Sequence, residues 1–213
     1  MSQVLVIDDE PSICWAVREL LNDLGHDVAV TSSAEEGLGI AENHPFDAVI
    51  LDVRLPGMDG ISAMGKLRPL VGPAPMIVIT AFGNLDTAVR AMEGGAFDYL
   101  VKPFDLDQAA SVVTRALDAR RNLEIPAKKS SQKSSKGHDH EELIGHSSAM
   151  QELFKQIALA ATADVPVLIT GESGTGKELV ARAIHRHSRR ESRSFLPVCL
   201  AALSTGLVER ELF

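Results

Sequence analysis

The sequence has little cysteine and no long apolar run. Its two cysteines, Cys14 and Cys199, lie in regions that predict different domains, so we expect no structural disulfide and two reduced thiols. No apolar stretch approaches the roughly 20 residues that a membrane-spanning helix needs. The first ten residues, MSQVLVIDDE, lack the basic start of a secretory signal peptide. These absences predict a cytoplasmic protein with no membrane partner.

Positive charge is scarce in the first part of the chain. The formal net charge of −8 at pH 7 divides into −9 for residues 1–121 and +1 for residues 122–213. An acidic surface repels the phosphate backbone of nucleic acids, so we expect no broad nucleic-acid binding by the first part. At 213 residues the chain has room for one domain and part of another.

Short apolar runs alternate with helical patterns along the first part. The runs are rich in β-branched residues and too short for helices, and they occupy positions 4–7, 28–30, 48–51, 76–79 and 99–101. Between them apolar residues recur at helical spacing, most clearly from Ile13 to Leu24. Parallel strands need crossover connections that usually contain a helix, so we expect an α/β fold with five buried strands in a parallel, doubly wound sheet. The expected strand order is the flavodoxin-like 2-1-3-4-5.

A change of composition separates a second pattern from the first. Residues 124–141 read EIPAKKSSQKSSKGHDHE, which is rich in Ser and Lys and offers no apolar face. Helical spacing returns from about Ser147 to Thr162, and an apolar run at Val165–Thr170 predicts a strand. We therefore expect a first domain at 1–121, a flexible linker at 122–141 and the N-terminal part of a second α/β domain at 142–213.

Polar residues follow the predicted strands at the ends where a doubly wound sheet binds its ligands. Asp8 and Asp9 follow the first strand, Asp52 the third, Thr80 the fourth and Lys102 the fifth. Neighbouring carboxylates raise one another's pKa unless a cation offsets them, so the cluster predicts a bound hard dication. Mg²⁺ is the expected ion, because it prefers a few carboxylates together with phosphate oxygens.

This arrangement predicts phosphoryl transfer to an aspartate. Asp9, Asp52 and the main-chain carbonyl of Arg54 are the expected Mg²⁺ ligands. Asp8 is expected to act through a water molecule. Asp52 is the expected nucleophile, and Lys102 is the expected counter-charge for the transferring oxygens.

Thr80 completes the predicted site, because its hydroxyl is expected to bind a phosphoryl oxygen and so to pull the loop that follows. Each of these residue types also has an ordinary structural interpretation, since an Asp after a strand often caps a helix and a Thr there often makes a turn. The whole set in this order favours the functional interpretation. A phosphatase with an aspartate nucleophile is a disfavoured alternative, because such enzymes typically have a second acid where this chain has Arg54.

The same residues resemble the response-regulator receiver family over residues 1–121. The resemblance rests on the runs IDDE, LDVRLPGMDG, VITAF and FDYLVKPF. It implies that Asp52 is the phosphoacceptor, that a sensor histidine kinase is the phosphodonor and that the receiver forms a homodimer. It also implies that Tyr99 is a switch aromatic that turns inward as Thr80 moves, and that the Lys102–Pro103 bond is cis. A half-buried core tyrosine is the alternative for Tyr99.

A glycine-rich loop follows the second apolar pattern. The run VPVLIT leads into GESGTGKE, and a helical stretch follows, which is the context of a phosphate-binding loop. Main-chain N–H groups and a helix start can hold phosphate oxygens, and Lys177 can reach the outer phosphates of ATP. Glu178 replaces the usual Ser or Thr, and a glycine-rich turn without nucleotide is the alternative. The expected ATP-binding residues are Gly171, Glu172, Ser173, Gly174, Thr175, Gly176, Lys177 and Glu178.

This loop resembles that of the AAA+ domains in NtrC-like activators of sigma-54 RNA polymerase, where glutamate after the lysine is usual. The runs LIGHSSAMQELFKQI and FLPVCLAALSTGLVERELF are also similar, although Cys199-Leu200 replaces the usual Asn-Cys. The resemblance implies a fragment of an AAA+ sigma-54 interaction domain that the receiver controls. Because the resemblance is still running at Phe213, we expect the chain as given not to hydrolyse ATP, and to meet sigma-54 RNA polymerase and enhancer DNA only through further parts. A stand-alone phosphorylatable binding switch is the alternative.

Overall fold

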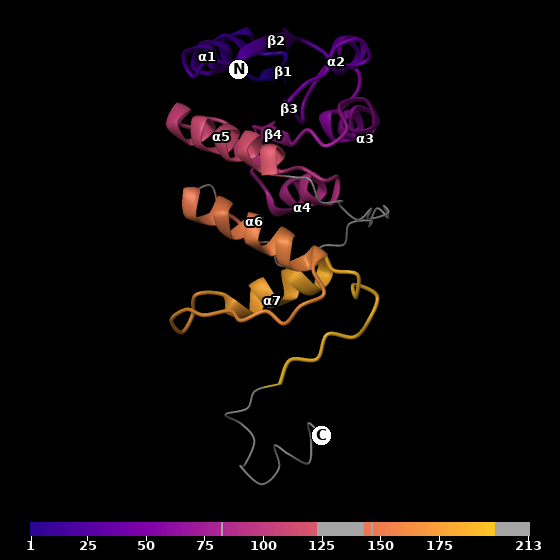
Figure 1. The fold of residues 1–213 in the computed structure, drawn as a ribbon. Helices are drawn as coiled ribbons and strands as arrows, with labels where there is room; N and C mark the ends of the chain where they lie inside the picture. Colours follow the sequence, from indigo (N-terminus) through magenta and orange to yellow (C-terminus); the bar gives the residue numbers. More distant parts are fainter. Residues whose placement is uncertain (82, 123–142, 146, 199–213) are drawn as a thin grey trace.

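Five strands form one parallel sheet in the order β2-β1-β3-β4-β5, as predicted (Figure 1). The structure is a computed structural model that describes residues 1–81, 83–122, 143–145 and 147–198. Each strand coincides closely with a predicted apolar run, and the flavodoxin-like fold is confirmed. The strands are β1 (Gln3–Ile7), β2 (Asp27–Thr31), β3 (Ala48–Asp52), β4 (Met76–Thr80) and β5 (Asp98–Val101).

Burial explains why the central strands are continuous apolar runs. Every residue of β3 and β4 is buried, because helices cover both faces of the sheet. β2 lies at the edge of the sheet and is half-buried except at Thr31, so the prediction of five buried strands is wrong for β2. An edge strand has one neighbouring strand, which leaves one side of β2 more accessible, whereas β5 at the other edge is buried at three of its four residues.

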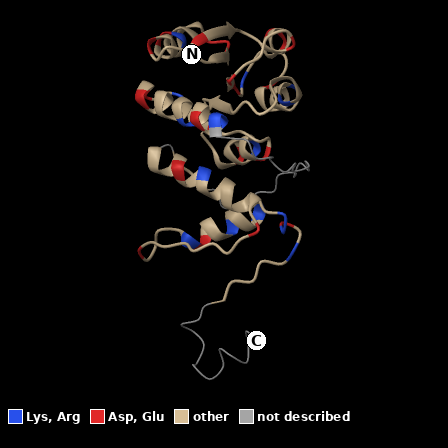
Figure 2. Ribbon diagram, in the orientation of Figure 1, with Lys and Arg blue, Asp and Glu red and all other residues tan. Residues whose placement is uncertain are grey.

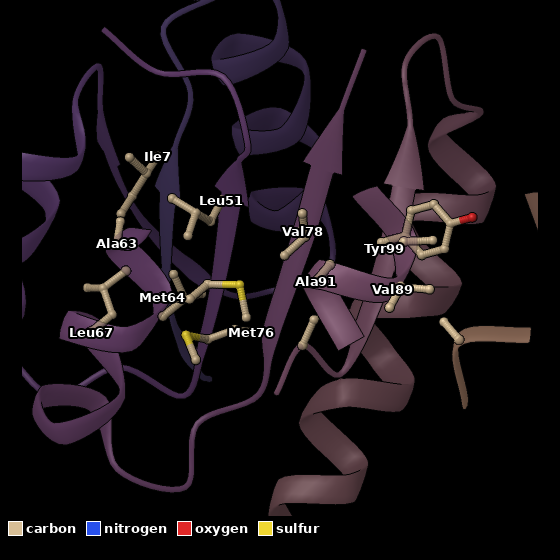
Figure 3. Packing of buried hydrophobic residues seen from close by; sticks show 14 of the residues in the cluster. Ile7, Leu51, Ala63, Met64, Leu67, Met76, Val78, Val89, Ala91 and Tyr99 are labelled. Atoms are coloured by element: carbon tan, nitrogen blue, oxygen red, sulfur yellow. The ribbon is translucent and has the colours of Figure 1, made fainter. Parts of the chain in front are cut away.

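Helices on the two faces of the sheet enclose two separate cores. α1 and α5 pack on one face, where Val17, Leu21 and Val113 are buried against the strands. α2, α3 and α4 pack on the other face, whose buried side chains include Met64 and Leu67 (Figure 3). The helices are α1 (Pro11–Asp23), α2 (Ala34–Ala41), α3 (Gly60–Val71), α4 (Leu85–Glu93) and α5 (Leu106–Asn122).

Side-chain caps fix the starts of α2, α3 and α4. Ser33, Asp59 and Asn84 each accept a hydrogen bond from the main-chain N–H three residues further on. Such a cap satisfies an N–H that has no partner within the helix and stabilises it by about 0.5–2 kcal/mol. Because these caps stand in the loops after β2, β3 and β4, they fix where α2, α3 and α4 begin.

The second pattern forms helices but not the predicted strand. α6 (Ser148–Thr162) and α7 (Lys177–Arg186) coincide with the predicted helical stretches. Residues 165–170 form no strand, and Val165 and Leu168 are 61% and 88% exposed. The main chain of a strand needs a neighbouring strand to satisfy its N–H and C=O groups, and the described residues offer this segment none.

α6 lies along α4 and extends the core of the first domain (Figure 1). Phe154, Ile157 and Ala158 of α6 are buried in the same cluster as the residues of α2, α3 and α4. Charged residues of both signs lie on α5, α6 and α7 (Figure 2). The second part of the chain therefore packs against the first domain through α6.

Some predictions fall on residues that the structure does not describe. Apart from Asn122, which ends α5, the predicted linker at 122–141 lies outside the described residues, as do residues 199–213 with Cys199. The Lys102–Pro103 peptide bond is cis, as expected. Within the described residues, no helix is long and apolar enough to cross a membrane.

Candidate functional site

Strand pairing brings the predicted site residues to one edge of the sheet. β1 and β3 are neighbours, so Asp8, which follows β1, lies beside Asp52, the last residue of β3. β4 and β5 are also neighbours, and Thr80 ends β4 while Lys102 follows β5. Asp8, Asp52 and Thr80 are almost completely buried, with 1%, 3% and 1% of their surface exposed. The fold therefore gathers acids, a hydroxyl and an ammonium group in one place.

The Lys102 ammonium lies among three carboxylates. Its Nζ atom is 2.6 Å from Asp52 Oδ2, 2.8 Å from Asp8 Oδ2 and 2.7 Å from Glu10 Oε1. Burial alone would lower the pKa of Lys102, but its hydrogen bonds to Asp52, Asp8 and Glu10 outweigh burial and raise that pKa above its usual value. Lys102 therefore keeps its proton and holds a positive charge beside Asp52.

Main-chain N–H groups fix the two buried carboxylates. The N–H of Arg54 donates to Asp52 Oδ1 at 2.8 Å, and the N–H of Glu10 donates to Asp8 Oδ1 at 2.9 Å. Burial raises the pKa of Asp8, and the hydrogen bond from Lys102 offsets this only in part. Asp52 thus has one oxygen on a main-chain amide and the other on Lys102, whereas Asp8 Oδ1 accepts from both the Glu10 N–H and, at 3.1 Å, Lys102 Nζ.

The acidic residues are arranged so that they can hold a metal ion. One oxygen each from Asp8, Glu10 and Asp52 lies within 4.8 Å of the others. Asp8 Oδ2 is buried and, although it is 2.8 Å from Lys102 Nζ, it accepts no hydrogen bond. A buried carboxylate oxygen without a hydrogen bond suits a hard dication such as Mg²⁺, which takes oxygen ligands. The residues present therefore fit the predicted ion.

Glu10 is the site residue that the sequence interpretation missed. Its carboxylate reaches Lys102 and joins the acidic group, whereas Asp9 is exposed and does not. Asp9 instead lines a cavity of about 350 Å³ beside the site, together with Trp15. The signal that could have found Glu10 is its place as the third acid of the run IDDE. Ligand roles for Asp9 and for the carbonyl of Arg54 stay predictions.

Tyr99 connects the first domain to α6. It is 6% exposed, and its hydroxyl points away from the neighbouring core side chains (Figure 3). The hydroxyl donates a hydrogen bond to the main-chain oxygen of Gln151 at 2.9 Å. Burial raises the pKa of Tyr99 above its usual value, so the phenol stays protonated. Tyr99, the predicted switch residue, therefore contacts α6 directly.

The glycine-rich loop leads into α7, as predicted. Gly174 and Gly176 have φ angles of 84° and 83°, in the left-handed region that favours glycine. Lys177 begins α7, and its Nζ atom donates to the main-chain oxygens of Gly171 and Glu172 at 3.0 and 2.6 Å. The ammonium group therefore lies over the loop that is predicted to hold phosphate.

Neighbouring side chains further define this loop. Thr175 Oγ1 donates to the main-chain oxygen of Glu172 at 2.8 Å, which braces the turn, and Ser173 is exposed. Glu178, at the position where Ser or Thr was the general expectation, forms an ion pair of 2.6 Å with Arg182 one helical turn further on. Glu178 therefore stabilises α7 in this structure, and ATP binding by the loop stays a prediction.

A doubly wound sheet whose edge gathers a buried aspartate, neighbouring acids and a lysine defines the class of receiver domains. The model of the response regulator receiver domain matches residues 4–114, and the chain belongs to this family. The model of the sigma-54 interaction domain matches residues 143–213. The chain thus combines a receiver with part of a sigma-54 interaction domain, and the resemblance to NtrC-like activators is confirmed.

Curated relatives match nearly the whole chain. The transcriptional regulatory protein ZraR of Salmonella typhimurium is 40% identical over 212 residues, which are 99% of this chain and 46% of ZraR. The DNA-binding transcriptional regulator NtrC of Klebsiella pneumoniae is 38% identical over 208 residues, which are 98% of this chain and 43% of NtrC. The chain therefore spans somewhat less than half the length of these relatives.

One of the similar solved structures spans the whole chain, and another is a receiver domain alone. NtrX from Brucella abortus, crystallised in complex with ATP, is 33% identical to this chain, with a TM-score of 0.54. The match covers 100% of this chain and 46% of NtrX. A CheY-like receiver domain from Methanospirillum hungatei is 26% identical with a TM-score of 0.55 and covers 57% of this chain and 98% of that domain.

Proposed function

We propose that Asp52 accepts a phosphoryl group from a sensor histidine kinase and that this modification controls a sigma-54-dependent activator. The observation that carries the proposal is the buried ion pair of 2.6 Å between Lys102 Nζ and Asp52 Oδ2, at the ligand-binding edge of the sheet. A lysine that stays protonated beside an aspartate is suited to balancing the charge of an arriving phosphoryl group.

The transfer step follows from the placement of these groups. One carboxylate oxygen of Asp52 forms the bond to phosphorus while the P–N bond of the phosphohistidine breaks, and the imidazole leaves with the electron pair and takes up a proton from solvent. The N–H of Arg54 holds Asp52 Oδ1, so Oδ2 is the oxygen turned toward the reacting group. Lys102 exchanges contacts with Glu10 and Asp8 for contacts with phosphoryl oxygens.

Mg²⁺ would be held by Asp8 and Asp52, with Asp9 or Glu10 as a further acid. When bound, the ion supplies positive charge next to the transferring oxygens. Trp15 is the only tryptophan and lines the cavity beside Asp9, so its fluorescence is a natural reporter of binding. We expect Asp8→Asn to weaken Mg²⁺ binding in a fluorescence titration, without any phosphodonor present.

Labelling of Asp52 tests the proposed function. We expect the chain to be labelled by a phosphorylated histidine kinase or by acetyl phosphate with Mg²⁺, and Asp52→Asn to abolish the label. The control is Asp118→Asn, which changes an exposed aspartate on α5 in the same way and should leave labelling intact. Persistent labelling of Asp52→Asn, located elsewhere by peptide mapping, would refute the assignment.

The glycine-rich loop supports a second proposal, that residues 171–178 bind ATP. Lys177 already lies over the loop carbonyls, and the loop ends at the start of α7. We expect Lys177→Ala to lose binding of a fluorescent ATP analogue, while Lys66→Ala, an exposed lysine on α3, retains it. Equal binding by the two variants would contradict an ATP site here. We also propose that residues 1–213 alone do not hydrolyse ATP, which a phosphate-release assay checks.

Contacts of the whole protein belong to this proposal as well. The chain matches under half the length of the regulators ZraR and NtrC, so sigma-54 RNA polymerase and enhancer DNA are proposed partners of the complete protein. A receiver homodimer whose population changes on phosphorylation is the proposed signal between receiver and activator. Light scattering after size exclusion, with and without beryllofluoride and Mg²⁺, measures that change.

A further inference from the structure

α6 covers the face of the receiver that α4 and β5 form. Phe154 and Ile157 are each 1% exposed and lie in one cluster with Leu85 and Val89 of α4 and with Tyr99 of β5. A cluster of this kind is stabilised by the removal of apolar surface from water, and it excludes other occupants from the same face. The helix that precedes the ATP loop is therefore in contact with the receiver's own core.

Gln151 of α6 holds two separate parts of the receiver at once. Its main-chain oxygen and its Oε1 accept hydrogen bonds from the Tyr99 hydroxyl at 2.9 and 3.3 Å. Its Nε2 donates to the main-chain oxygen of Gly83 at 2.8 Å. The packing is tight, because a Cβ atom at Gly83 would come within 2.5 Å of Gln151 Oε1.

An ion pair next to Tyr99 strengthens the same contact. Asp98 is 2% exposed and accepts from Lys155 of α6, at 2.7 Å, and from Arg115 of α5, also at 2.7 Å. A buried carboxylate needs such partners, because its desolvation is costly when it is unpaired. Lys155 and Gln151 are one helical turn apart, so one face of α6 makes both contacts.

Both points that Gln151 holds are close to the phosphorylation site along the chain. Gly83 lies three residues after Thr80, and Tyr99 lies three residues before Lys102. The N–H of Lys102 donates to the main-chain oxygen of Thr80 at 2.8 Å, which links the ends of β4 and β5. A shift of either strand end on phosphorylation would therefore act on the hydrogen bonds of Gln151.

We propose that Gln151 is a coupling residue: its hydrogen bonds to Tyr99 and Gly83 stabilise the unphosphorylated receiver, so that docking of α6 and phosphorylation of Asp52 oppose each other. The inference rests on the proposed function of Asp52. In this structure the Lys102 ammonium contacts three carboxylates. Any phosphate-bound arrangement that moves the main chain at Gly83 must break the hydrogen bond from Gln151 to Gly83. Such coupling is reciprocal, so releasing α6 also favours the phosphorylated form.

The test compares two glutamines on the same helix in the 213-residue chain. Gln151→Ala removes the bonds of Oε1 to Tyr99 and of Nε2 to Gly83 but keeps the bond from Tyr99 to the main-chain oxygen. Gln156→Ala removes an exposed side chain whose bond is to Glu152 within α6. We expect Gln151→Ala to bind beryllofluoride with Mg²⁺ at least about fivefold more tightly than the unchanged chain, and Gln156→Ala to bind equally. Trp15 fluorescence measures both affinities.

Hydrogen exchange separates coupling from a merely structural role. Saturating beryllofluoride should speed amide exchange in α6 of the unchanged chain, and Gly83→Ala, which displaces the Gln151 side chain, should tighten beryllofluoride binding as Gln151→Ala does. If Gln151→Ala loosens α6 but leaves the affinity unchanged, the coupling is refuted while the proposed function stands. If the unchanged chain neither binds beryllofluoride nor labels at Asp52, the proposed function itself fails.

Discussion

The receiver and the segment that follows it both have sequence patterns of strands and helices, but the receiver forms both kinds of element and the described part of the second segment forms only its helices. In the receiver, the predicted strands have neighbouring strands and helices cover both sides. In the second segment the predicted helices form, but the apolar run at 165–170 pairs with no other strand of the described residues, and Leu168 is 88% exposed. The difference follows from where each element finds its hydrogen-bond partners.

A helix satisfies its main chain internally, and a strand does not. α6 and α7 need only an apolar surface to pack on, and α6 finds one on α4. The run at 165–170 requires the N–H and C=O groups of a second strand, which the described residues do not supply. Local pattern thus suffices to predict a helix, whereas a strand also depends on its neighbours in the sheet.

Replacing Phe154 should separate the two regions. Phe154→Ala removes the largest buried side chain of α6, and Phe→Ala in a core costs about 3–5 kcal/mol. Most of this loss should fall on the docking of α6, so hydrogen exchange should rise in α6 and α7 while the amides of β3 and β4 stay protected. Leu159→Ala, at a position 45% exposed on the same helix, is the control.

Global unfolding induced by Phe154→Ala would overturn the comparison. If the protection of β3 and β4 fell in parallel with that of α6, the two regions would form a single cooperative unit rather than a core with a docked helix.

A pair of leucines measures the same contrast by denaturation. Leu51 is completely buried in β3, and Leu51→Ala should lower the free energy of unfolding by about 2–5 kcal/mol. Leu168→Ala should change it by no more than about 0.5 kcal/mol, because that side chain is exposed. Urea titrations of the two variants give both values. A large cost for Leu168→Ala would indicate that residues 165–170 are buried in a sheet after all.

Sequence reasoning reached the sheet and most of the site, because both follow from short-range signals. The strands follow from the apolar runs, while their order and the gathering of Asp8, Asp52 and Lys102 follow from the general rules for doubly wound sheets. Glu10 was missed because the local sequence pattern gives no reason to expect its side chain to reach a lysine 92 residues away.

The docking of α6 was beyond such reasoning for a different physical reason. An amphipathic helix shows that it will bury one face, but not which surface will cover it. The contacts of Gln151 with Tyr99 and Gly83 join positions 52 and 68 residues apart, and they depend on how two separate elements fit in space. The prediction of a strand at 165–170 failed for the same reason, since its partner was assumed and not read from the sequence.

The close packing of the receiver predicts opposite effects for two glycines of α3. A Cβ atom at Gly60 would lie 1.9 Å from the main-chain oxygen of Asp52, so Gly60→Ala must move the main chain of the site. We expect a loss of about 1–3 kcal/mol and slower labelling of Asp52. At Gly65 nothing lies within 4 Å of the added carbon, and Gly65→Ala should stabilise α3 by about 0.4–1 kcal/mol.

Thermal or urea unfolding of both variants, read beside acetyl phosphate labelling, checks this pair. Normal stability and normal labelling in Gly60→Ala would show that the receiver can relax around its phosphoacceptor, and the contrast in packing between the receiver and residues 165–170 would then be smaller than proposed.

The smallest expected effect is a pH dependence of the contact between the two regions. His187, just after α7, has a side chain only 13% exposed, with Nε2 3.5 Å from Asp86 Oδ1 of α4. Burial lowers the pKa of His187, and the charge of Arg186 lowers it further. The charges of Asp86 and Glu191 raise it, but the net pKa lies below its usual value of 6.5.

A histidine whose pKa is lowered on docking binds protons more readily when undocked, so its contribution to docking is complete above about pH 6.5 and is lost as the pH falls below that value. The rate of amide exchange in α7, corrected for its intrinsic pH dependence, should therefore rise relative to that in β3 as the pH is lowered from 7.5 to 5.5. Burial and the charge of Glu191 raise the pKa of Glu93, so Glu93 changes the stability of docking with pH in the opposite direction to His187. The contribution of the imidazole must therefore be isolated by substitution. His187→Gln should remove the change and the exposed His44→Gln should keep it; a change that persists in His187→Gln would assign the pH dependence to another group.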